Sequence, residues 1–440
     1  MLTVTHVTQA MQTVLTRVAN QAGRATGFIQ REVKLSGASF CQSLVFGWLA
    51  NPEATLEELC QTAALVGVEI TPQGLDQRFT AEGARCLYQV LQESVDQVIA
   101  VEPVAVPILQ RFSGVYLEDS STIVLPAELA EVWTGCGNAT GQGEAALKLN
   151  VRLEFLRGRL HGPVVTAGRT HDRQTTLQAQ PLPPGSLRLA DLNYWSLDQF
   201  QELAHQDSYW LSRFKLQTAI FTLDGQRWTL VELLQAQPQD GLDLRVELGV
   251  QHRLPARLVA HRLPPQVAEQ RRRRVRAEAR RRGKTPSQTQ LFLADWLVFV
   301  TNVPPEMLSF AEIFVVVRVR WQIELLFKLW KSHNLIDESR SQKPWRRLCE
   351  IYAKLIGVII QHWILLVGCW HFPNRSLFKA VQTIQKHAWY LASVFTCSIS
   401  LSRALTSIQH CLAAGCRINK RKKIPHTYQL LLALDDGALA

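Results

Sequence analysis

The sequence predicts a mixed α/β protein, with helical regions at both ends of the chain and a mostly β segment inserted before the last strand of its sheet. Three observations predict this class. Residues 1 to about 105 carry helical signals, short runs typical of strands begin at Gly114, and roughly the last hundred residues are again helical in pattern. The order of these runs indicates a mixed sheet that a β-rich segment interrupts.

Composition bounds the kind of protein this is. The chain has 440 residues, of which 47% are hydrophobic and 8% aromatic, so it is long enough for several domains with a sizeable core, and extensive disorder is excluded. The formal net charge of +11 favours an anionic partner, with nucleic acid ahead of a membrane surface.

Cysteine usage and apolar stretches predict a cytoplasmic protein. The nine cysteines are scattered, odd in number and without a CxxC pair, so we expect reduced thiols and no zinc site around Cys411 and Cys416. The N-terminus lacks the basic segment and continuous apolar core of a signal peptide. The longest apolar stretch, 351–370, is interrupted by Lys354, Gln361 and His362, which predicts a buried helix and no membrane span.

The N-terminal region contains two helix starts. Residues 55–58, Thr-Leu-Glu-Glu, resemble a capping box, and Thr71-Pro72 marks a second start after a short turn around Gly67. The pair fits a helix-turn-helix and an ordinary helical hairpin equally well.

Strand-like runs follow on both sides of the LSRF segment at 211–214. The earlier runs are VYLED, ALKLNVRLEF, PVVTAG and LRLADL, and the later ones are AIFTL, WTLVELL, LDLRVELGV, ARLVAHRL and WLVFVTNV. In the second run Lys148, Asn150 and Arg152 alternate with apolar residues, which predicts a half-exposed antiparallel strand.

Two charge runs stand out. Residues 266–284 predict a strongly basic helix that contains Arg271, Arg272, Arg273 and Arg274, and a shorter basic cluster occupies 420–423. Each run fits either a solvated surface or a contact with phosphates, because every cation that neutralises a phosphate releases condensed counterions.

The segment VRVRWQIELLFKLWK at 317–331 predicts a helix with one charged stripe. Its charged members Arg320, Glu324, Lys328 and Lys331 fall within a sector of about 80° at roughly 100° per residue. A surface ladder of i,i+4 ion pairs would explain the stripe. Against this, the aromatic neighbours Trp321, Phe327 and Trp330 are expected to leave little surface facing solvent.

Three acids are candidates for one metal site. Asp119 and Asp191 each end a short strand-like run, and Glu324 lies on the striped helix. Taken singly, an Asp at the end of a strand is usually a turn or a helix cap. Two or three carboxylates with open water positions are, however, the usual arrangement for Mg²⁺. Two such ions about 3.5 to 4 Å apart can activate a nucleophile and stabilise the leaving oxygen of a phosphodiester.

The striped helix also carries a family resemblance. Arg320, Glu324 and Lys331 resemble in type and spacing the C-terminal signature of DDE transposases of the insertion-sequence-4 family, which reads Tyr, two residues, Arg, three residues, Glu, six residues, Lys. Val317 stands at the Tyr position. The resemblance also covers LEDSSTIVLP around Asp119, LADLNYWS around Asp191, the LSR that ends in Arg213, and VTNVP at 300–304, so it extends over roughly residues 110 to 345. Asn193 stands where similar proteins commonly carry Gly.

The resemblance implies an RNase H-like catalytic core with a β-strand insertion, in which Asp119, Asp191 and Glu324 bind two Mg²⁺ ions per active site, with Mn²⁺ as a substitute. Similar enzymes nick transposon ends and join the freed 3′-hydroxyl to target DNA, often through a hairpin intermediate. The positions in the motif assign phosphate contacts to Arg320, Lys328, Lys331 and Arg213. Trp296 matches an aromatic that stacks against a flipped base, although a Trp entering a strand is ordinarily a core residue.

We therefore expect a transposase that binds terminal inverted repeats and target DNA as a homodimer, in the cytoplasm and on the nucleoid when bound to DNA. The alternatives are a metal-dependent nuclease that does not join strands, and a catalytically inactive regulator that binds transposon ends. The expected domains are a helical DNA-binding domain at 1–105, the catalytic core at 106–215 and 289–345, the β-rich insertion with its basic helix at 216–288, and a helical region at 346–440.

Overall fold

The computed structural model describes residues 3–31, 34–97, 99–137, 143–237, 239–372, 374–419 and 425–435. Two compact units divide the chain, and both are discontinuous in sequence. Unit 1 comprises 1–110, 118–180 and 321–429, and unit 2 comprises 111–117, 181–320 and 430–440. The mixed α/β class with helical ends is confirmed. The basic cluster at 420–423 lies outside the described residues.

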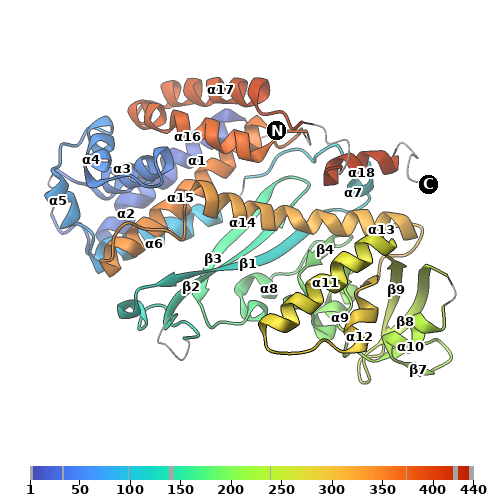
Figure 1. The fold of residues 1–440 in the computed structure, drawn as a ribbon. Helices are drawn as coiled ribbons and strands as arrows, with labels where there is room; N and C mark the ends of the chain where they lie inside the picture. The colour runs from blue at the N-terminus through green and yellow to red at the C-terminus, as the bar shows by residue number, and fades with distance from the viewer. Residues whose placement is uncertain are drawn as a thin grey trace. The chain divides into compact units, whose positions relative to one another are not determined.

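Helices from both ends of the chain build most of unit 1, where they pack side by side (Figure 1). The N-terminal set is α1 (Val4–Gln12), the π-helix η1 (Thr13–Val18), α2 (Ala19–Ala25), α3 (Gly37–Ala50), α4 (Leu56–Leu65), α5 (Pro72–Asp76), α6 (Ala81–Asp96) and α7 (Pro107–Gln110). The C-terminal set is α14 (Trp321–His333), α15 (Pro344–Gly368), α16 (Leu377–Val394) and α17 (Ser398–Gly415), whereas α18 (Thr427–Asp435) passes from unit 1 into unit 2 at Leu430.

Both expected helix starts in the N-terminal region are confirmed. The hydroxyl of Thr55 accepts a hydrogen bond from the amide of Glu58, whose carboxylate accepts one from the Thr55 amide at 2.7 Å, and this completes a capping box. Thr71 caps α5, with Pro72 in its first turn. Since α5 has only five residues, it spans about 7.5 Å. A helix of that length favours the helical hairpin over a helix-turn-helix with a groove-reading second helix.

The apolar stretch at 351–370 is the buried helix that its polar interruptions predicted. Among the described residues α15 is the one helix long and apolar enough to cross a membrane, and the apolar window of that helix is entirely buried inside the protein. Lys354 is buried in it because the ammonium group is fully satisfied: it lies 2.7 Å from Glu350 Oε1 and donates to the carbonyls of Leu335 and Glu338.

The sheet of unit 1 has the strand order β3-β2-β1, formed by β3 (Arg159–Ala167), β2 (Ala145–Glu154) and β1 (Val115–Leu125), which enters this unit at Glu118. β2 and β3 are antiparallel. The short helices η2 (Ala127–Leu129), η3 (Asp172–Gln174) and α8 (Thr176–Ala179) complete the unit.

The expectation that β2 is half-exposed is wrong. Asn150 and Arg152 are only 2% and 4% exposed. Their nitrogen atoms find partners in neighbouring residues, since Asn150 Nδ2 donates to Thr166 Oγ1 at 3.0 Å and Arg152 Nε donates to Glu118 Oε1 at 2.6 Å. The alternation of polar and apolar residues in β2 therefore marks two faces of the strand that are both buried.

The strands of unit 2 follow the order β4-β5-β10-β9-β8-β6-β7. They are β4 (Leu187–Ala190), β5 (Tyr209–Arg213), β6 (Ile220–Phe221), β7 (Arg227–Trp228), β8 (Gly241–Leu248), β9 (Leu254–Arg262) and β10 (Trp296–Thr301). β4 and β5 are parallel, and the pairs β5–β10, β10–β9, β9–β8, β8–β6 and β6–β7 are antiparallel.

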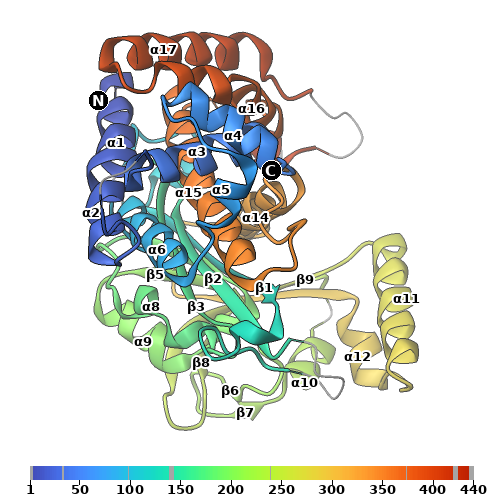
Figure 2. The same cartoon turned by 90° about the vertical axis from the view of Figure 1, so that its left-hand side faces the viewer.

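The helices of unit 2 are η4 (Leu192–Tyr194), α9 (Leu197–His205), α10 (Leu230–Gln235), α11 (Pro265–Arg281), α12 (Gln288–Leu293), α13 (Phe310–Val316) and η5 (Val317–Arg320). Figure 2 shows α11 and α12 side by side. A core of apolar side chains includes Phe200 and Trp210, whose rings stack with centroids 4.3 Å apart.

Two sequence expectations about these elements are wrong. WTLVELL is helical beyond Trp228, because Thr229 and Glu232 form a capping box that starts α10. The striped segment at 317–331 is not one continuous helix. It begins as the 3-10 turn η5, and regular α-helix starts only at Trp321.

Candidate active site

Asp119 lies within β1 and is partly exposed. Its carboxylate Oδ1 accepts a hydrogen bond from the amide of Ser120 at 2.8 Å, which limits the side chain's freedom to rotate. The preceding residue, Glu118, points to the opposite face of the strand and is 1% exposed, where it meets Arg152 and accepts from Gln178 Nε2 at 3.1 Å. Glu118 thus forms hydrogen bonds inside the protein, whereas Asp119 remains partly accessible to solvent.

A second polar cluster holds β1 immediately after Asp119. The hydroxyl of Ser120 donates to Asp172 Oδ1 at 2.9 Å, and Lys148 Nζ lies 3.0 Å from the same oxygen. Lys148 also donates to the carbonyl of Thr170 at 2.6 Å. The sequence did not predict this cluster, because Asp172 lies 52 residues after Ser120 and no local motif connects the two. The cluster fixes the backbone whose amide holds the Asp119 carboxylate.

Glu324 lies in the first turn of α14 and is partly exposed. On the same helix Lys328 is exposed, and Lys331 Nζ lies 3.4 Å from Asp337 Oδ2. The expected burial of the aromatic neighbours holds for Phe327 and Trp330, which are 6% and 1% exposed. It is wrong for Trp321, which is 53% exposed, so the stripe borders solvent at its start.

Asp119 and Glu324 lie on elements that run in the same direction. In Figure 1 both β1 and α14 run from right to left. Lys331 Nζ lies 3.5 Å from the carbonyl of Thr122 and so links the two elements. Three strand residues back from Thr122 span about 10 Å. Seven helical residues back from Lys331 span about 10.5 Å. The two steps lead to Asp119 on β1 and to Glu324 on α14, so both acids precede the link on their own element by similar lengths.

The remaining residues of the expected site belong to unit 2. Asp191 directly follows β4 and is partly exposed, and among the described residues its side chain forms no capping hydrogen bond to the turn η4 that it precedes. Arg213 ends β5 and is exposed. Arg320 ends η5 and is partly exposed, and Val317 begins the same turn.

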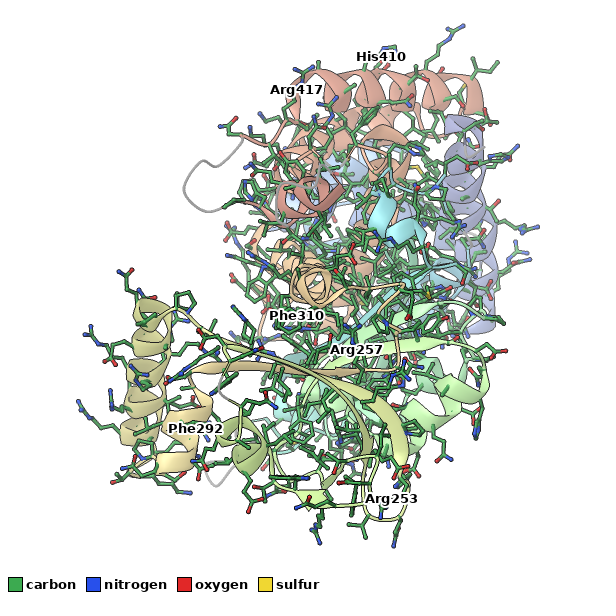
Figure 3. The ribbon with its side chains drawn as sticks, turned by 90° about the vertical axis from the view of Figure 1, so that its right-hand side faces the viewer. Arg253, Arg257, Phe292, Phe310, His410 and Arg417 are labelled. Carbon is green, nitrogen blue, oxygen red and sulfur yellow. The ribbon has the colours of Figure 1, made fainter. Side chains whose placement is uncertain are left out.

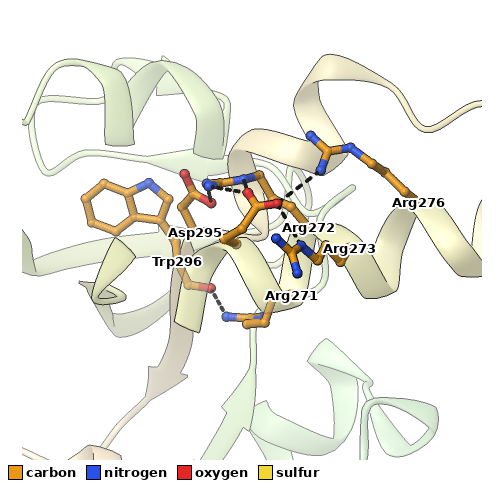
Figure 4. A network of polar contacts seen from close by, with 7 residues as sticks. Arg271, Arg272, Arg273, Arg276, Asp295 and Trp296 are labelled. Carbon is orange, nitrogen blue, oxygen red and sulfur yellow. Dashed lines mark hydrogen bonds and ion pairs between the residues drawn. The ribbon is translucent and has the colours of Figure 1, made fainter. Parts of the chain in front are cut away.

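The basic helix α11 uses some of its arginines internally (Figure 4). Arg271 donates to the carbonyl of Trp296 at 2.9 Å, and burial lowers its pKa, with Arg213 acting in the same direction. Arg272 pairs with Asp295 at 2.5 Å and with Glu269 at 2.8 Å.

Other arginines of α11 are more exposed. Arg273 lies 3.2 Å from Glu269 with three quarters of its side chain exposed. Among the described residues, Arg274, Arg280 and Arg281 have no acidic side chain within ion-pair distance, and all three are exposed. The run at 271–274 therefore combines two structural residues with two accessible ones.

Trp296 has the position of a core residue. It is 4% exposed, belongs to the apolar core of unit 2, and has the guanidinium of Arg262 6.0 Å from its ring centroid. The core interpretation of this Trp therefore fits the structure better than base stacking does.

The donor set of unit 1 suits a hard cation. Within the part of the chain that the structure describes, no three His, Cys, Asp or Glu side chains are gathered as a metal ion would require. Asp119 and Glu324 belong to unit 1, and Asp191 belongs to unit 2. The two acids of unit 1 offer carboxylate oxygens, which are the ligands that Mg²⁺ and Mn²⁺ prefer.

Comparison with known proteins places this chain among transposases. A family model described as "Transposase DDE domain" matches residues 111–360. The transposase for insertion sequence element IS231F from Bacillus thuringiensis subsp. israelensis is 24% identical over 91% of this chain and 89% of its own length. The transposase for IS231D from Bacillus thuringiensis subsp. finitimus is 25% identical over 94% and 91%. A putative transposase for IS186A from Escherichia coli is 34% identical over 28% of this chain and 33% of its own length.

Proposed function

The chain belongs to the transposase DDE domain family, and from this membership we propose that it moves an insertion sequence by cutting the ends of the element and joining them to target DNA. The observation that carries the proposal is the pair of partly exposed acids Asp119 on β1 and Glu324 on α14, two elements of unit 1 that Lys331 links through the carbonyl of Thr122. The signature spacing of Arg320, Glu324 and Lys331 supports the insertion-sequence-4 family in particular.

Asp119, Asp191 and Glu324 would together hold two divalent cations, Mg²⁺ with Mn²⁺ as a substitute. When bound, the cations activate a water molecule or a 3′-hydroxyl and stabilise the leaving oxygen of the phosphodiester. The protein's part is positioning: the amide of Ser120 orients the Asp119 carboxylate, and the Ser120–Asp172–Lys148 cluster holds that amide in place.

The cations of the striped segment would hold the DNA backbone. Lys328 is exposed one helical turn after Glu324, and Lys331 follows on the same face of α14. Arg320 and Arg213 would add contacts from unit 2, where Arg213 is exposed at the end of β5. Charged groups next to the metal ligands can fix the phosphates for an in-line displacement.

The rest of the chain would recognise DNA and organise the complex. We assign end binding to the helical region at 1–105 and general phosphate contacts to the exposed arginines of α11, and we propose that two copies pair the two ends of the element. The net charge of +11 supports contact with DNA over an extended surface.

The central test removes one acid at a time. We expect Asp119→Ala, Asp191→Ala and Glu324→Ala each to abolish Mg²⁺-dependent cleavage of DNA that carries the ends of the element, while affinity for that DNA, measured without metal, stays within about twofold. Asp198→Ala is the matched control, because this acid of α9 is 87% exposed and its contact with His252 lies at the surface. Near-normal cleavage by any of the three variants would contradict the metal role of that residue.

A strand-transfer assay separates the transposase from its rivals. Pre-cleaved ends with a free 3′-hydroxyl are incubated with Mg²⁺ and a supercoiled plasmid, and we expect joined products. Cleavage without joining would identify a nuclease, and binding without either reaction would identify an end-binding regulator. Both results contradict the proposal.

A further inference from the structure

The C-terminal region carries no negative charge over a long stretch of sequence. From Ile351 to Leu434 the chain contains neither Asp nor Glu, although it contains the basic residues Lys354, Arg375, Lys379, Lys386, Arg403, Arg417, Lys420, Arg421, Lys422 and Lys423. Surface helices of soluble proteins ordinarily mix both signs of charge. His410, on the outer side of α17 (Figure 3), belongs to the same stretch. The exposed cations of this stretch that the structure describes, among them Lys379, Lys386 and Arg403, complement an anion.

The outward face of α16 combines these cations with exposed aromatic rings. Phe378, Trp389 and Tyr390 are 51%, 42% and 50% exposed. At about 100° per residue, they share one sector of about 120° with the four other exposed side chains of the helix, Lys379, Gln382, Lys386 and Ser393. The opposite sector contains the buried residues of α16. Three large rings on the solvent side of a helix require an explanation beyond packing.

This face continues from the end of the helix that carries Glu324. His333, the last residue of α14, packs edge-on against Phe378 with ring centroids 4.1 Å apart. Gln385 Nε2 donates to the carbonyl of His333 at 2.9 Å. The stripe on α14 that contains Lys328 and Lys331 is therefore followed, within unit 1, by the aromatic face of α16.

We propose that the outward face of α16 binds a single-stranded segment of DNA next to the end that is being processed. This inference rests on the proposed function only in requiring that the chain acts on DNA. Phe378, Trp389 and Tyr390 stack on unpaired bases, and Lys379 and Lys386 contact phosphates. Strand processing supplies such a segment, because base pairs beside a cleaved bond lose stacking on one side and fray more easily.

The composition of the face decides between a single strand and other occupants. Aromatic rings interleaved with cations bind single strands, since every base presents a stacking surface and the backbone supplies the charge. Duplex DNA hides those surfaces and would need cations alone. A second copy of this face would bring Lys379 and Lys386 against like charges with no acid on the helix to offset them.

The test uses the full-length protein without divalent metal, so that cleavage plays no part. Binding of a fluorescent twenty-residue oligothymidine is compared with binding of a twenty-base-pair duplex. We expect the double variant Trp389→Ala/Tyr390→Ala to weaken oligothymidine binding by about tenfold or more and duplex binding by less than about twofold. Leu223→Ala, which removes another exposed apolar side chain, in unit 2, is the control and should change neither.

A second pair of variants tests the phosphate contacts. Lys379→Gln/Lys386→Gln should flatten the dependence of log affinity on log salt for oligothymidine by about 1.4, which corresponds to two phosphates of a single strand. An unchanged oligothymidine affinity in the aromatic double variant would overturn the proposal. So would loss of self-association on light scattering with DNA binding intact, because that result assigns the face to a second copy. Neither result depends on whether Asp119, Asp191 and Glu324 hold metal.

Discussion

Glu118 and Asp119 are adjacent acids with opposite uses. Alternation along β1 directs Glu118 inward, where Arg152 and Gln178 satisfy it, and leaves Asp119 partly exposed with one oxygen held by the next amide. A buried ion pair adds little net stability over an apolar pair, yet leaving one of its charges alone is costly. The strand that carries Asp119 therefore depends on both members of the Glu118–Arg152 pair.

Replacement of Arg152 tests this dependence. We expect Arg152→Met to lower the free energy of unfolding by about 3 to 5 kcal/mol, because it leaves the Glu118 carboxylate buried without its cation. Urea denaturation followed by circular dichroism measures the loss. The double variant Glu118→Leu/Arg152→Leu should recover most of it. If the double variant were as unstable as the single one, packing and not charge would be the cause.

His362 predicts how stability depends on pH. Burial lowers the pKa of this α15 side chain to about 4, and its Nε2 donates to the Gly158 carbonyl at 2.7 Å. The unfolded chain takes up a proton near pH 6.5 and the folded chain only near pH 4. The stability that the neutral, buried His362 gives the folded protein is thus fully present above pH 6.5. It is lost as the pH falls toward 4, because the unfolded chain binds a proton that the folded chain does not.

The matched experiment compares His362→Leu with the wild-type protein at pH 7 and pH 4.5. Between these values the wild-type protein should lose about 2 to 3 kcal/mol more of its unfolding free energy than the variant, as measured by urea denaturation. His410→Leu, at an exposed position, serves as the control and should behave like the wild-type protein. Equal losses in all three proteins would show that His362 is not the group that responds.

At the scale of whole elements, local signals predicted where helices and strands lie better than they predicted their exposure. The capping residues Thr55 and Thr71 start helices as expected, because a cap acts through residues three positions away. The run WTLVELL has the pattern of a strand, although its own Thr229 and Glu232 form a capping box that starts a helix. The burial of Arg152 was not predictable, since Glu118 is 34 residues distant in sequence.

In the basic helix α11, we expect some arginines to stabilise the fold and others to contact DNA. Arg272 pairs with Glu269 of the same helix and with Asp295 outside it, so Arg272→Met should lower the unfolding free energy and leave the salt dependence of DNA binding unchanged. Arg280→Gln/Arg281→Gln removes two exposed charges. It should leave stability unchanged and flatten the plot of log affinity against log salt by about 1.8 for duplex DNA.

Equilibrium binding at several salt concentrations, together with thermal unfolding, distinguishes the two kinds of arginine. An unchanged salt slope in the Arg280/Arg281 variant would identify the outer side of α11 as a solvated surface. The sequence does not distinguish the partly buried arginines of α11 from the exposed ones, because consecutive arginines look alike in a sequence. Arg271 and Arg272 differ from the others in contacting Trp296, at the start of β10, and Asp295, which precedes it.

At the scale of the molecule, the three acids of the proposal come from three distant segments of sequence. Asp119 and Glu324 are more than 200 residues apart in sequence, yet both lie in unit 1, whereas Asp191 lies in unit 2. The family resemblance implied all three acids, because each stands in a recognisable local motif. Their distances from one another follow from tertiary structure, which no local motif contains. An experiment on the whole chain must therefore test whether the three acids act together.

Cleavage of the protein by its own bound metal provides that test. When Fe²⁺ replaces Mg²⁺ in the presence of ascorbate and peroxide, the hydroxyl radicals formed at the ion cut the nearest backbone. We expect three cuts, near Asp119, Asp191 and Glu324, mapped by mass spectrometry of the fragments. Excess Mg²⁺ should suppress them together. Asp191→Ala should weaken all three, since the acids share the ions, whereas Asp198→Ala should change none. Cuts near Asp119 and Glu324 without one near Asp191 would remove Asp191 from the site and leave the two acids of unit 1 as its only ligands among the three.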